Sequence, residues 1–267
     1  MEQAIVDLDV GLDDKTAIAE AFGRAAHTYD AHASFQRDVG HQLLAQLPHD
    51  LRGKRVLDLG CGTGFFSEEL RQRGANVVCC DLSLEMLLMA KTRCGQKDVI
   101  YQQGDAESLP MATNTFDYVF SSLALQWCQD LSRPLKEMRR VTKPGGQLVF
   151  STLLEGSLKE LKRAWASIDS YQHVNHFVTL NQVNIALAQA DCSEHDLDLP
   201  AITVWYDSAF SLMRDLKGIG ANYVSGRSHG LTRRHSLIQV EKAYQLYRNQ
   251  QGLVPATYQV CLGVIYL

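Results

Sequence analysis

The sequence predicts an α/β fold, a doubly wound and mainly parallel sheet with helices on both of its faces. Over residues 54–152, short apolar runs alternate with helical patterns, the order that buries a parallel sheet between two helix layers. The first apolar run, residues 56–59, leads into the glycine-rich turn 60–64 and then a helix. The second apolar run ends in an acid, Asp81. We therefore expect ligands to bind at the carboxyl ends of the strands.

The segment before the sheet is expected to be helical beyond its first residues. Residues 1–14 are acidic and weakly patterned, so we expect a loose terminus there. Residues 15–22 and 31–47 place apolar side chains on one helix face, and Pro48 stops the second helix. Residues 1–50 are thus predicted to form a helical cap segment.

The sheet region predicts five strands with helices between them. The strands are expected at residues 56–59, 77–80, 99–101, 116–122 and 147–150, and the helices at 65–70, 83–93 and 135–141. Ser83 has the residue type and position of an N-cap.

Beyond residue 152 the regular alternation stops. Helices are expected at 157–168, 180–190 and 208–216, and strands at 202–206 and 258–265. The last two strands would complete a seven-stranded sheet whose final strand is antiparallel. The pieces 153–190 and 208–250 are then cap insertions that lie, with residues 1–50, over the carboxyl ends of the strands.

Composition excludes several classes of function. The chain of 267 residues is 46% hydrophobic and has a net charge of −4, so whole-molecule attraction to nucleic acid or an anionic membrane is not indicated. It has no long apolar run and no basic leader, so we expect a cytoplasmic protein. The seven cysteines include no C-x-x-C pair, and His173 and His176 lack neighbouring ligands. No metal site is predicted.

The glycine-rich turn itself predicts the kind of ligand. A dinucleotide turn reads G-x-G-x-x-G, but here the third glycine, Gly64, comes one residue early and Phe65 fills the required position. Asp58 lies just before the first glycine, where it would repel a pyrophosphate. A carboxylate there suits a ligand with a positive end. This combination indicates S-adenosylmethionine (SAM), which carries an ammonium and a sulfonium and no phosphate.

The strand ends supply a role for each part of SAM. Asp58 is expected to hold the ammonium, directly or through water. Asp81 follows Asp58 by 23 residues, close to the spacing at which a carboxylate binds ribose hydroxyls. Asp105 is expected to accept from the adenine amino group, with Met86 as an apolar wall. The alternatives are structural: Asp58 as a helix cap, Asp105 as a turn former and Met86 as core.

The order of these motifs resembles the class I SAM-dependent methyltransferases over residues 50–152. The resemblance implies a Rossmann-like methyltransferase domain, residues 51–267, with SAM as methyl donor and S-adenosylhomocysteine as product. The residues expected to contact the cofactor are Phe22, Tyr29, Gln36, Asp58, Gly60, Cys61, Gly62, Asp81, Leu82, Met86, Gly104, Asp105, Ala106, Glu107, Ser121, Leu123 and Trp127.

The flanking segments are similar to a narrower family. Residues 18–36, 215–222, 231–233 and 255–258 resemble the malonyl-acyl-carrier-protein O-methyltransferases of biotin synthesis, the BioC family. The resemblance implies that the free carboxylate of a malonyl thioester, on acyl carrier protein or coenzyme A, becomes a methyl ester that starts pimeloyl synthesis.

The resemblance leaves the cation that holds the malonyl carboxylate open. The candidates are Arg24, His27, Arg214, Lys217 and Arg227, and we favour Lys217 and Arg227 because both lie among glycines in the cap stretch. Tyr29 and Phe22 are expected to close over SAM and the malonyl group, and we count Tyr29, Lys217 and Arg227 as the catalytic set.

A late basic run is expected to dock the acidic carrier protein, or else to be a solvated helix face. It consists of Arg227, Arg233, Arg234, Lys242 and Arg248. The rival functions are a methyltransferase acting on another small molecule, such as a quinone precursor, and, more distantly, a nicotinamide oxidoreductase.

Overall fold

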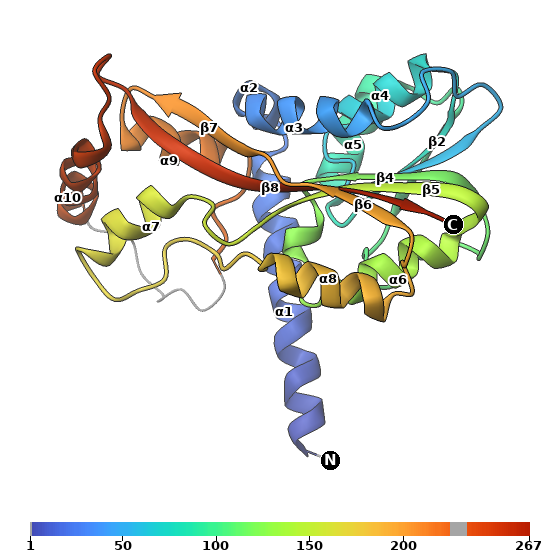
Figure 1. Cartoon of the computed structure of the whole chain (residues 1–267), viewed down its shortest axis with the longest axis horizontal. Coiled ribbons are helices and arrows are strands. Elements are labelled where there is room, and N and C mark those ends of the chain that lie inside the picture. The colour runs from blue at the N-terminus through green and yellow to red at the C-terminus, as the bar shows by residue number, and fades with distance from the viewer. Residues whose placement is uncertain (1, 225–233) are drawn as a thin grey trace.

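Eight strands form one sheet in the computed structural model, which describes residues 2–224 and 234–267 (Figure 1). The strand order is β3-β2-β1-β4-β5-β8-β6, and β7 also pairs with β8. The strands are β1 Arg55–Leu59, β2 Asn76–Asp81, β3 Val99–Gln103, β4 Phe116–Ser122, β5 Thr142–Leu153, β6 His195–Asp198, β7 Ala201–Tyr206 and β8 Val254–Tyr266. Strands β1 to β5 are parallel and β8 is antiparallel to β5, as the sequence predicts.

The described sheet has one strand more than the predicted seven because its sixth strand is interrupted. Asp198 pairs with Leu262 in β6, and Ala201 pairs with Gln259 in β7, so the register with β8 continues unshifted across the break. Pro200 lies in that break and cannot donate to the ladder. The topology is therefore the expected one, with a proline dividing one strand into two.

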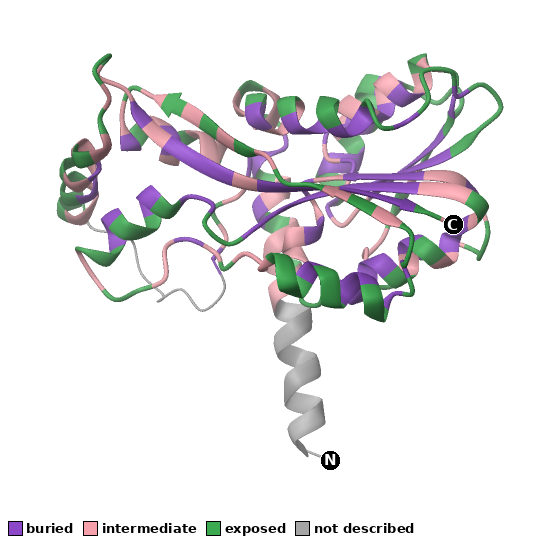
Figure 2. Cartoon of the chain, in the orientation of Figure 1, coloured by how far each residue is buried: buried purple, intermediate pink, exposed green. Residues whose placement is uncertain are grey.

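Helices cover both faces of the sheet. One face carries α3 Ser34–Leu44, α4 Phe65–Gln72 and α5 Leu84–Cys94. The other carries α6 Ser132–Val141 and α8 Leu180–Gln189. Buried side chains alternate along β1, where Val56 packs toward the first layer and Leu57 toward the second. Figure 2 shows the buried strands enclosed between these layers.

Helix α8 departs from the sequence-based expectation. It falls in the segment 153–190 that we expected to cap the strand ends, but Val183, Ala186 and Leu187 are buried in the cluster that also holds Leu135 of α6. The apolar face of α8 therefore packs in the same helix layer as α6, against the sheet. Only the part of the 153–190 segment that precedes α8 lies in the cap.

The cap gathers at one end of the molecule, where β7 and the first half of β8 extend beyond the parallel strands (Figure 1). Its described helices are α7 Lys159–Ala166, α9 Ala209–Gly218 and α10 Arg234–Tyr244, with the short turns η1 Leu125–Trp127 and η2 Gln245–Tyr247 nearby. The N-terminal α1, Glu2–Ala25, is helical from residue 2, so the expected loose terminus to residue 14 is wrong for the backbone. Helix α2 is Tyr29–His32.

Two glycines bring the C-terminal and N-terminal parts of the cap together. A Cβ on Gly218 would lie 2.2 Å from the His32 ring, and Gly220, at φ 79°, lies against the backbone of Phe22. His32 Nδ1 lies 2.7 Å from Asp215 Oδ1, and Thr28 donates to the Gly218 carbonyl at 2.9 Å. The end of α9 is therefore packed directly onto α1 and α2.

In the part of the chain that the structure describes, no helix combines the length and the apolar character needed to cross a bilayer.

Candidate active site

The glycine-rich turn holds the ends of β1 and β2 together. Gly60, Gly62 and Gly64 have positive φ angles of 71°, 53° and 78°, which side chains other than glycine rarely adopt. A Cβ on Gly60 would lie 2.3 Å from the Ala124 side chain. The turn therefore requires glycine for both its conformation and its close approach to η1.

Asp81 fixes the position of this turn. Its Oδ2 accepts from the Gly62 amide at 2.9 Å, and its Oδ1 accepts from the Ser83 amide at 2.8 Å. Burial raises the pKa of Asp81, although these amides oppose the shift. The carboxylate thus links the turn to the start of α5, where Ser83 acts as the predicted N-cap.

Asp58 lies one strand away in a more enclosed position. It is 2% exposed and accepts a hydrogen bond from the Ser67 hydroxyl of α4. Burial, and to a lesser degree the neighbouring Asp81, raise the pKa of Asp58 to about 7. A cation bound beside Asp58 would therefore stabilise its ionised form.

The first cavity lies between this turn and α1, and contains about 770 Å³ of empty space, open solvent included. Its lining includes these predicted cofactor residues: Phe22, Tyr29, Gly60, Gly62, Asp81, Leu82, Met86, Gly104, Asp105, Ala106, Glu107, Leu123 and Trp127. The structure thus brings together side chains from α1, β2, α5 and η1 that lie as many as 105 residues apart in the sequence.

The first cavity also has lining residues that sequence reasoning missed: Lys15, Ile18, Leu59 and Cys128. Ser122 and Ala124, which also line it, belong to the stretch 121–127 that we expected to pass near the methionine end of SAM. Ser122 lines the cavity in place of the predicted Ser121, whose hydroxyl instead donates to the Leu59 carbonyl at 2.9 Å inside the sheet. Successive residues of a strand face opposite sides, so the prediction was one residue out of phase.

Lys15 occupies an acidic corner of the first cavity. Its ammonium contacts both Asp105 and Glu107, and Glu107 has a side chain only 3% exposed. Burial lowers the pKa of Lys15, but its hydrogen bonds to the two carboxylates outweigh burial and raise it overall. Asp105 also accepts from the Glu107 amide at 3.0 Å, the local turn contact that was the structural alternative for this residue.

A third cavity continues from the first toward α3 and α4. It is lined by Asp58, Cys61 and Gln36, three predicted cofactor residues absent from the first cavity. The Gln36 Oε1 atom is buried without a hydrogen-bond partner among the described residues. An unpartnered buried acceptor is costly, so this atom and Asp58 suit a ligand that brings N–H donors, such as an ammonium group.

The second cavity lies beneath the cap and also contains about 770 Å³ of empty space. Its walls are mostly apolar and come from α7, α9, β8 and the segment before α8. The polar lining residues include Gln36, Gln126, His173 and Asn175. Among the described residues that line it, none is Lys or Arg.

Tyr29 marks the point where the three cavities meet, because it lines all of them. Phe22, Leu123 and Trp127 line both the first and the second. Burial, more than the nearby Asp81 and Asp30, raises the pKa of Tyr29 far above its ordinary value. The phenol is therefore neutral and serves as a wall between two binding spaces.

Of the two favoured substrate cations, only Lys217 lies within the described residues, and it is not at this junction. Lys217 is exposed on the last turn of α9 and lines none of the three cavities. Arg227 lies outside the described residues, as does Arg233 of the late basic run. The glycines that made Lys217 a candidate instead let the end of α9 pack against His32 and Phe22.

Comparisons with known proteins agree with this geometry. Residues 57–150 match the family model described as "Methyltransferase domain". The chain is 44% identical over 254 residues to the malonyl-[acyl-carrier protein] O-methyltransferase of Serratia marcescens, covering 95% of this chain and 96% of that protein. It is 41% identical over 253 residues to the protein of the same name from Salmonella typhimurium, covering 94% and 97%.

Solved structures resemble the fold at low sequence identity. The YcgJ protein of Bacillus subtilis has a TM-score of 0.61 at 19% identity, covering 86% of this chain and 97% of that one. A putative methyltransferase of Bacillus halodurans has a TM-score of 0.60 at 18% identity, covering 85% and 97%.

Proposed function

The chain belongs to the malonyl-[acyl-carrier protein] O-methyltransferases, and on that premise we propose that it methylates the free carboxylate of a malonyl thioester. The methyl ester would start pimeloyl synthesis for biotin. The observation that carries the proposal is the junction at Tyr29, where a cavity with the cofactor residues meets an apolar cavity under the cap. We also propose an N-terminal segment, residues 1–50, and a methyltransferase domain, residues 51–267. Within the first segment, α3 packs on the sheet face and not over the strand ends, so only the residues before α3 belong to the cap.

SAM is the methyl donor, and the residues present fit it. Asp58 and the unpartnered Gln36 Oε1 suit the ammonium, Asp81 suits the ribose hydroxyls, and Met86 and Leu82 supply apolar walls. When bound, SAM supplies a methyl group on a cationic sulfur, which leaves as a neutral thioether with the bonding electron pair.

The protein's own contribution is alignment and exclusion of water. A malonyl carboxylate is ionised at neutral pH, so no residue needs to remove a proton from it. The carboxylate is a weak nucleophile, so the cavity walls must hold it in line with the methyl group. Such positioning can lower the barrier by up to about 7–11 kcal/mol. Phe22, Tyr29 and Trp127 form an aromatic boundary that restricts water at this point.

The test of this function is direct. Malonyl-carrier protein is incubated with the enzyme and SAM, and mass spectrometry of the intact carrier should show one added methyl group. Acetyl-carrier protein, which lacks the carboxylate, should gain none. A quinone precursor methylated in place of the malonyl thioester would favour the rival methyltransferase, and comparing malonyl-carrier protein with malonyl-CoA settles the preferred carrier.

Lys15 gives a prediction about the cofactor. Lys15→Met removes the ammonium that joins α1 to Asp105 and Glu107, so it leaves two carboxylates facing each other and loosens one wall of the first cavity. We expect the Kd for S-adenosylhomocysteine to rise by about 5- to 30-fold, the range for one or two lost charge-assisted hydrogen bonds. Calorimetric titration measures it.

The matched control for Lys15 lies on the same helix. Arg24 pairs with Glu20, but both side chains are more than 60% exposed, and such pairs contribute little. Arg24→Met should leave the Kd within twofold, and Lys15→Arg should retain most of the affinity. An unchanged Kd in Lys15→Met would show that the ion pairs do not support the cofactor site.

The cap helices carry a basic surface suited to an acidic carrier protein. Helices α7, α9 and α10 contain seven Lys or Arg residues and three acids. Glu160, Asp215 and Glu241 are all engaged by hydrogen bonds inside the cap. Within the described residues, none of the seven cations on these helices forms an ion pair: Lys159, Lys162, Arg163, Arg214, Lys217, Arg234 and Lys242. We propose this basic cap surface as the docking site.

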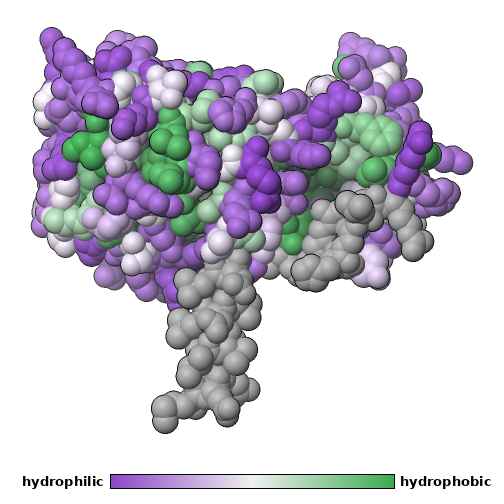
Figure 3. All heavy atoms as spheres, turned by 180° about the vertical axis from the view of Figure 1, so that it is seen from behind, coloured by the Kyte–Doolittle hydropathy of each residue, from purple (hydrophilic) through white to green (hydrophobic). Residues whose placement is uncertain are grey.

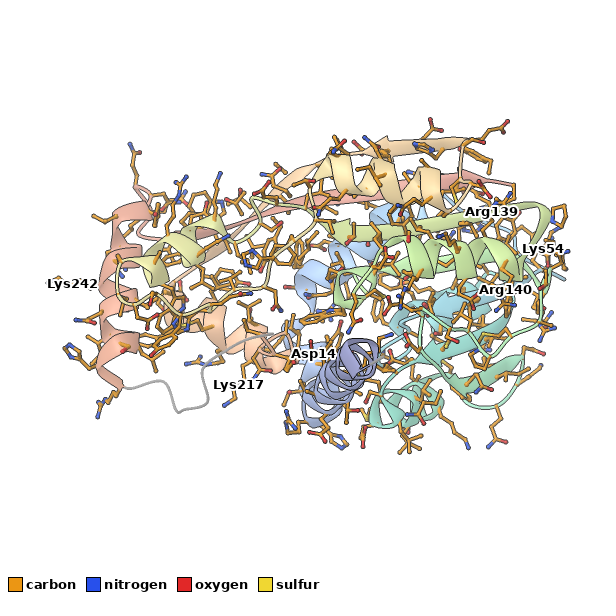
Figure 4. All side chains as sticks on the ribbon, turned by 90° about the horizontal axis from the view of Figure 1, so that it is seen from below. Asp14, Lys54, Arg139, Arg140, Lys217 and Lys242 are labelled. Atoms are coloured by element: carbon orange, nitrogen blue, oxygen red, sulfur yellow. The ribbon has the colours of Figure 1, made fainter. Side chains whose placement is uncertain are left out.

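Figures 3 and 4 show where cations of the cap lie and how hydropathy varies over one face. Figure 4 shows Lys217 and Lys242 at the cap end of the molecule and Lys54 and Arg139 at the opposite end. The drawn part of the face in Figure 3 is mixed, with hydrophobic patches separated by hydrophilic side chains.

Docking through charge predicts a dependence on salt. Raising the ionic strength from 0.05 to 0.5 M should raise KM for malonyl-carrier protein by about tenfold, because screening weakens exposed charge pairs. KM for S-malonyl pantetheine, which lacks the carrier, should change little. Lys217→Glu with Lys242→Glu should reproduce the effect at low salt, whereas Lys54→Glu with Arg139→Glu should not. If the two double variants raised KM for malonyl-carrier protein equally, the docking site would lie elsewhere.

A further inference from the structure

We propose that His173 supplies the positive charge that selects the carboxylate end of the substrate in the second cavity. The proposal rests on the proposed function, because it assumes that a malonyl group enters this cavity. His173 would act as a specificity-determining residue, donating a hydrogen bond from Nδ1 to one carboxylate oxygen and leaving the other oxygen free to receive the methyl group.

One face and one edge of the His173 ring have partners in the protein. The imidazole stacks on Trp165 of α7, with ring centroids 3.7 Å apart and planes inclined by 11°. Its side chain is only 9% exposed, and it lines the second cavity. The ring is thus held at the cavity wall in one orientation.

Asp169 determines which nitrogen faces the protein. His173 Nε2 lies 2.8 Å from Asp169 Oδ1, and an ionised carboxylate only accepts, so Nε2 carries a hydrogen. The same oxygen also accepts from the Tyr171 amide at 3.0 Å, which fixes the carboxylate. Nδ1 makes no hydrogen bond with any residue the structure describes. It is therefore the nitrogen left for a ligand.

The proposed contact needs one particular form of the His173 ring. A neutral ring that donates from Nε2 would present a lone pair at Nδ1, which repels a carboxylate. An imidazolium donates from both nitrogens, so it would hold Asp169 and the substrate carboxylate at the same time.

Few other charges compete in this cavity. Tyr29 and Tyr258 also line it, and burial raises the pKa of each so that both are neutral. On α7, Lys159, Lys162 and Arg163 are exposed, and Glu160 is held by Thr257 of β8. His173 is the one residue with a cationic form among the described lining residues.

A single imidazolium also explains how product would leave. Methylation removes the negative charge from the bound group, so the ester loses the ionic part of its contact with His173. The substrate is thereby bound more tightly than the product, without a fixed Arg or Lys that would hold both carboxylate oxygens.

The test replaces the ring while keeping its stacking. His173→Phe retains a flat ring against Trp165 but has no nitrogen. KM for S-malonyl pantetheine should rise by about 10- to 100-fold, the range for a lost charge-assisted hydrogen bond, while KM for SAM stays within twofold. The methyl ester product, tested as an inhibitor, should bind the variant as it binds the wild type. His176→Phe, an exposed neighbour outside the second cavity, is the control.

Comparing two ligands separates this role from a structural one. In His173→Phe, binding of S-malonyl pantetheine should weaken, whereas binding of its methyl ester should stay as in the wild type. An unchanged KM in His173→Phe, or a loss of ester and malonyl binding to the same degree, would overturn the proposal. A wild type that fails to methylate malonyl thioesters would instead overturn the proposed function.

Discussion

Asp81→Ala should raise the Kd for SAM by at least about 100-fold. The carboxylate accepts from the Gly62 amide at 2.9 Å and the Ser83 amide at 2.8 Å, so its removal frees the glycine turn and deletes the group assigned to the ribose. Each charge-assisted hydrogen bond lost contributes about 1.5–3 kcal/mol. Losing two such bonds to the ribose hydroxyls of SAM accounts for a rise in Kd of about 100-fold. Calorimetric titration with SAM and S-adenosylhomocysteine measures it.

The melting temperatures of Asp81 variants should not change in parallel with their affinities for SAM. Burial raises the pKa of Asp81, so above the unfolded-state pKa its ionised form is less favourable in the folded protein than in the unfolded chain. Replacing the charge with the amide of Asp81→Asn should therefore leave the melting temperature of the free protein unchanged or slightly raised. Binding should still fall, because the amide offers one acceptor oxygen in place of two.

The control for Asp81 is an acid outside the site. Asp196 is exposed on β6, and Asp196→Ala should bind SAM as the wild type does. Wild-type affinity in Asp81→Ala would contradict the assignment of the ribose to the end of β2. A parallel loss of melting temperature and affinity would instead assign Asp81 a mainly structural role.

The parts of the fold that were predicted correctly have local signals. Strands β1 to β5 each combine an apolar run with a turn or an acid at the carboxyl end, and the acids at Asp58, Asp81 and Asp105 mark those ends. Parallel strands bring their carboxyl ends to one edge. The part of the first cavity formed by the strand ends could therefore be assembled from residues 50–130 alone, whereas Phe22 and Tyr29 were expected there only from the family resemblance.

The parts that were missed depend on contacts between distant segments. Lys15 lies 90 residues from Asp105, and nothing in its own neighbourhood distinguishes it from a surface lysine. His173 is defined by its stacking on Trp165 and by the cavity it lines. The helical pattern of α8 is equally compatible with a cap or a sheet layer, and only its partner α6 decides between them.

Lys217 shows how a correct motif can suggest the wrong role. The glycines that follow it, Gly218 and Gly220, were the reason for favouring Lys217 as a substrate cation. In the structure they allow α9 to approach α1 and α2, with Gly218 against the His32 ring and Gly220 against Phe22. The segment Leu216 to Ala221 then places Leu216, Ile219 and Ala221 in the wall of the second cavity, while Lys217 remains outside.

Gly218→Val should consequently destabilise the protein and damage the second cavity together. A Cβ at this position would lie 2.2 Å from the His32 ring, which the 2.7 Å contact with Asp215 holds in place. Valine, a β-branched residue, gains less than about 1 kcal/mol of helix propensity over glycine, whereas overpacking costs about 1–3 kcal/mol. We expect the free energy of unfolding to fall by about 2 kcal/mol in urea titrations, and kcat/KM for malonyl-carrier protein to fall by about tenfold.

The cause can be isolated by removing the ring that the new side chain meets. In a His32→Ala background the space beside Gly218 is open, so Gly218→Val should cost at least 1 kcal/mol less than it does in the wild type, a coupling typical of residues in contact. The double variant should also recover part of the lost kcat/KM. If the two substitutions are simply additive in the free energy of unfolding, the His32 contact is not what requires glycine at this position, and the link between the end of α9 and the cavity wall must be sought in Ile219 instead.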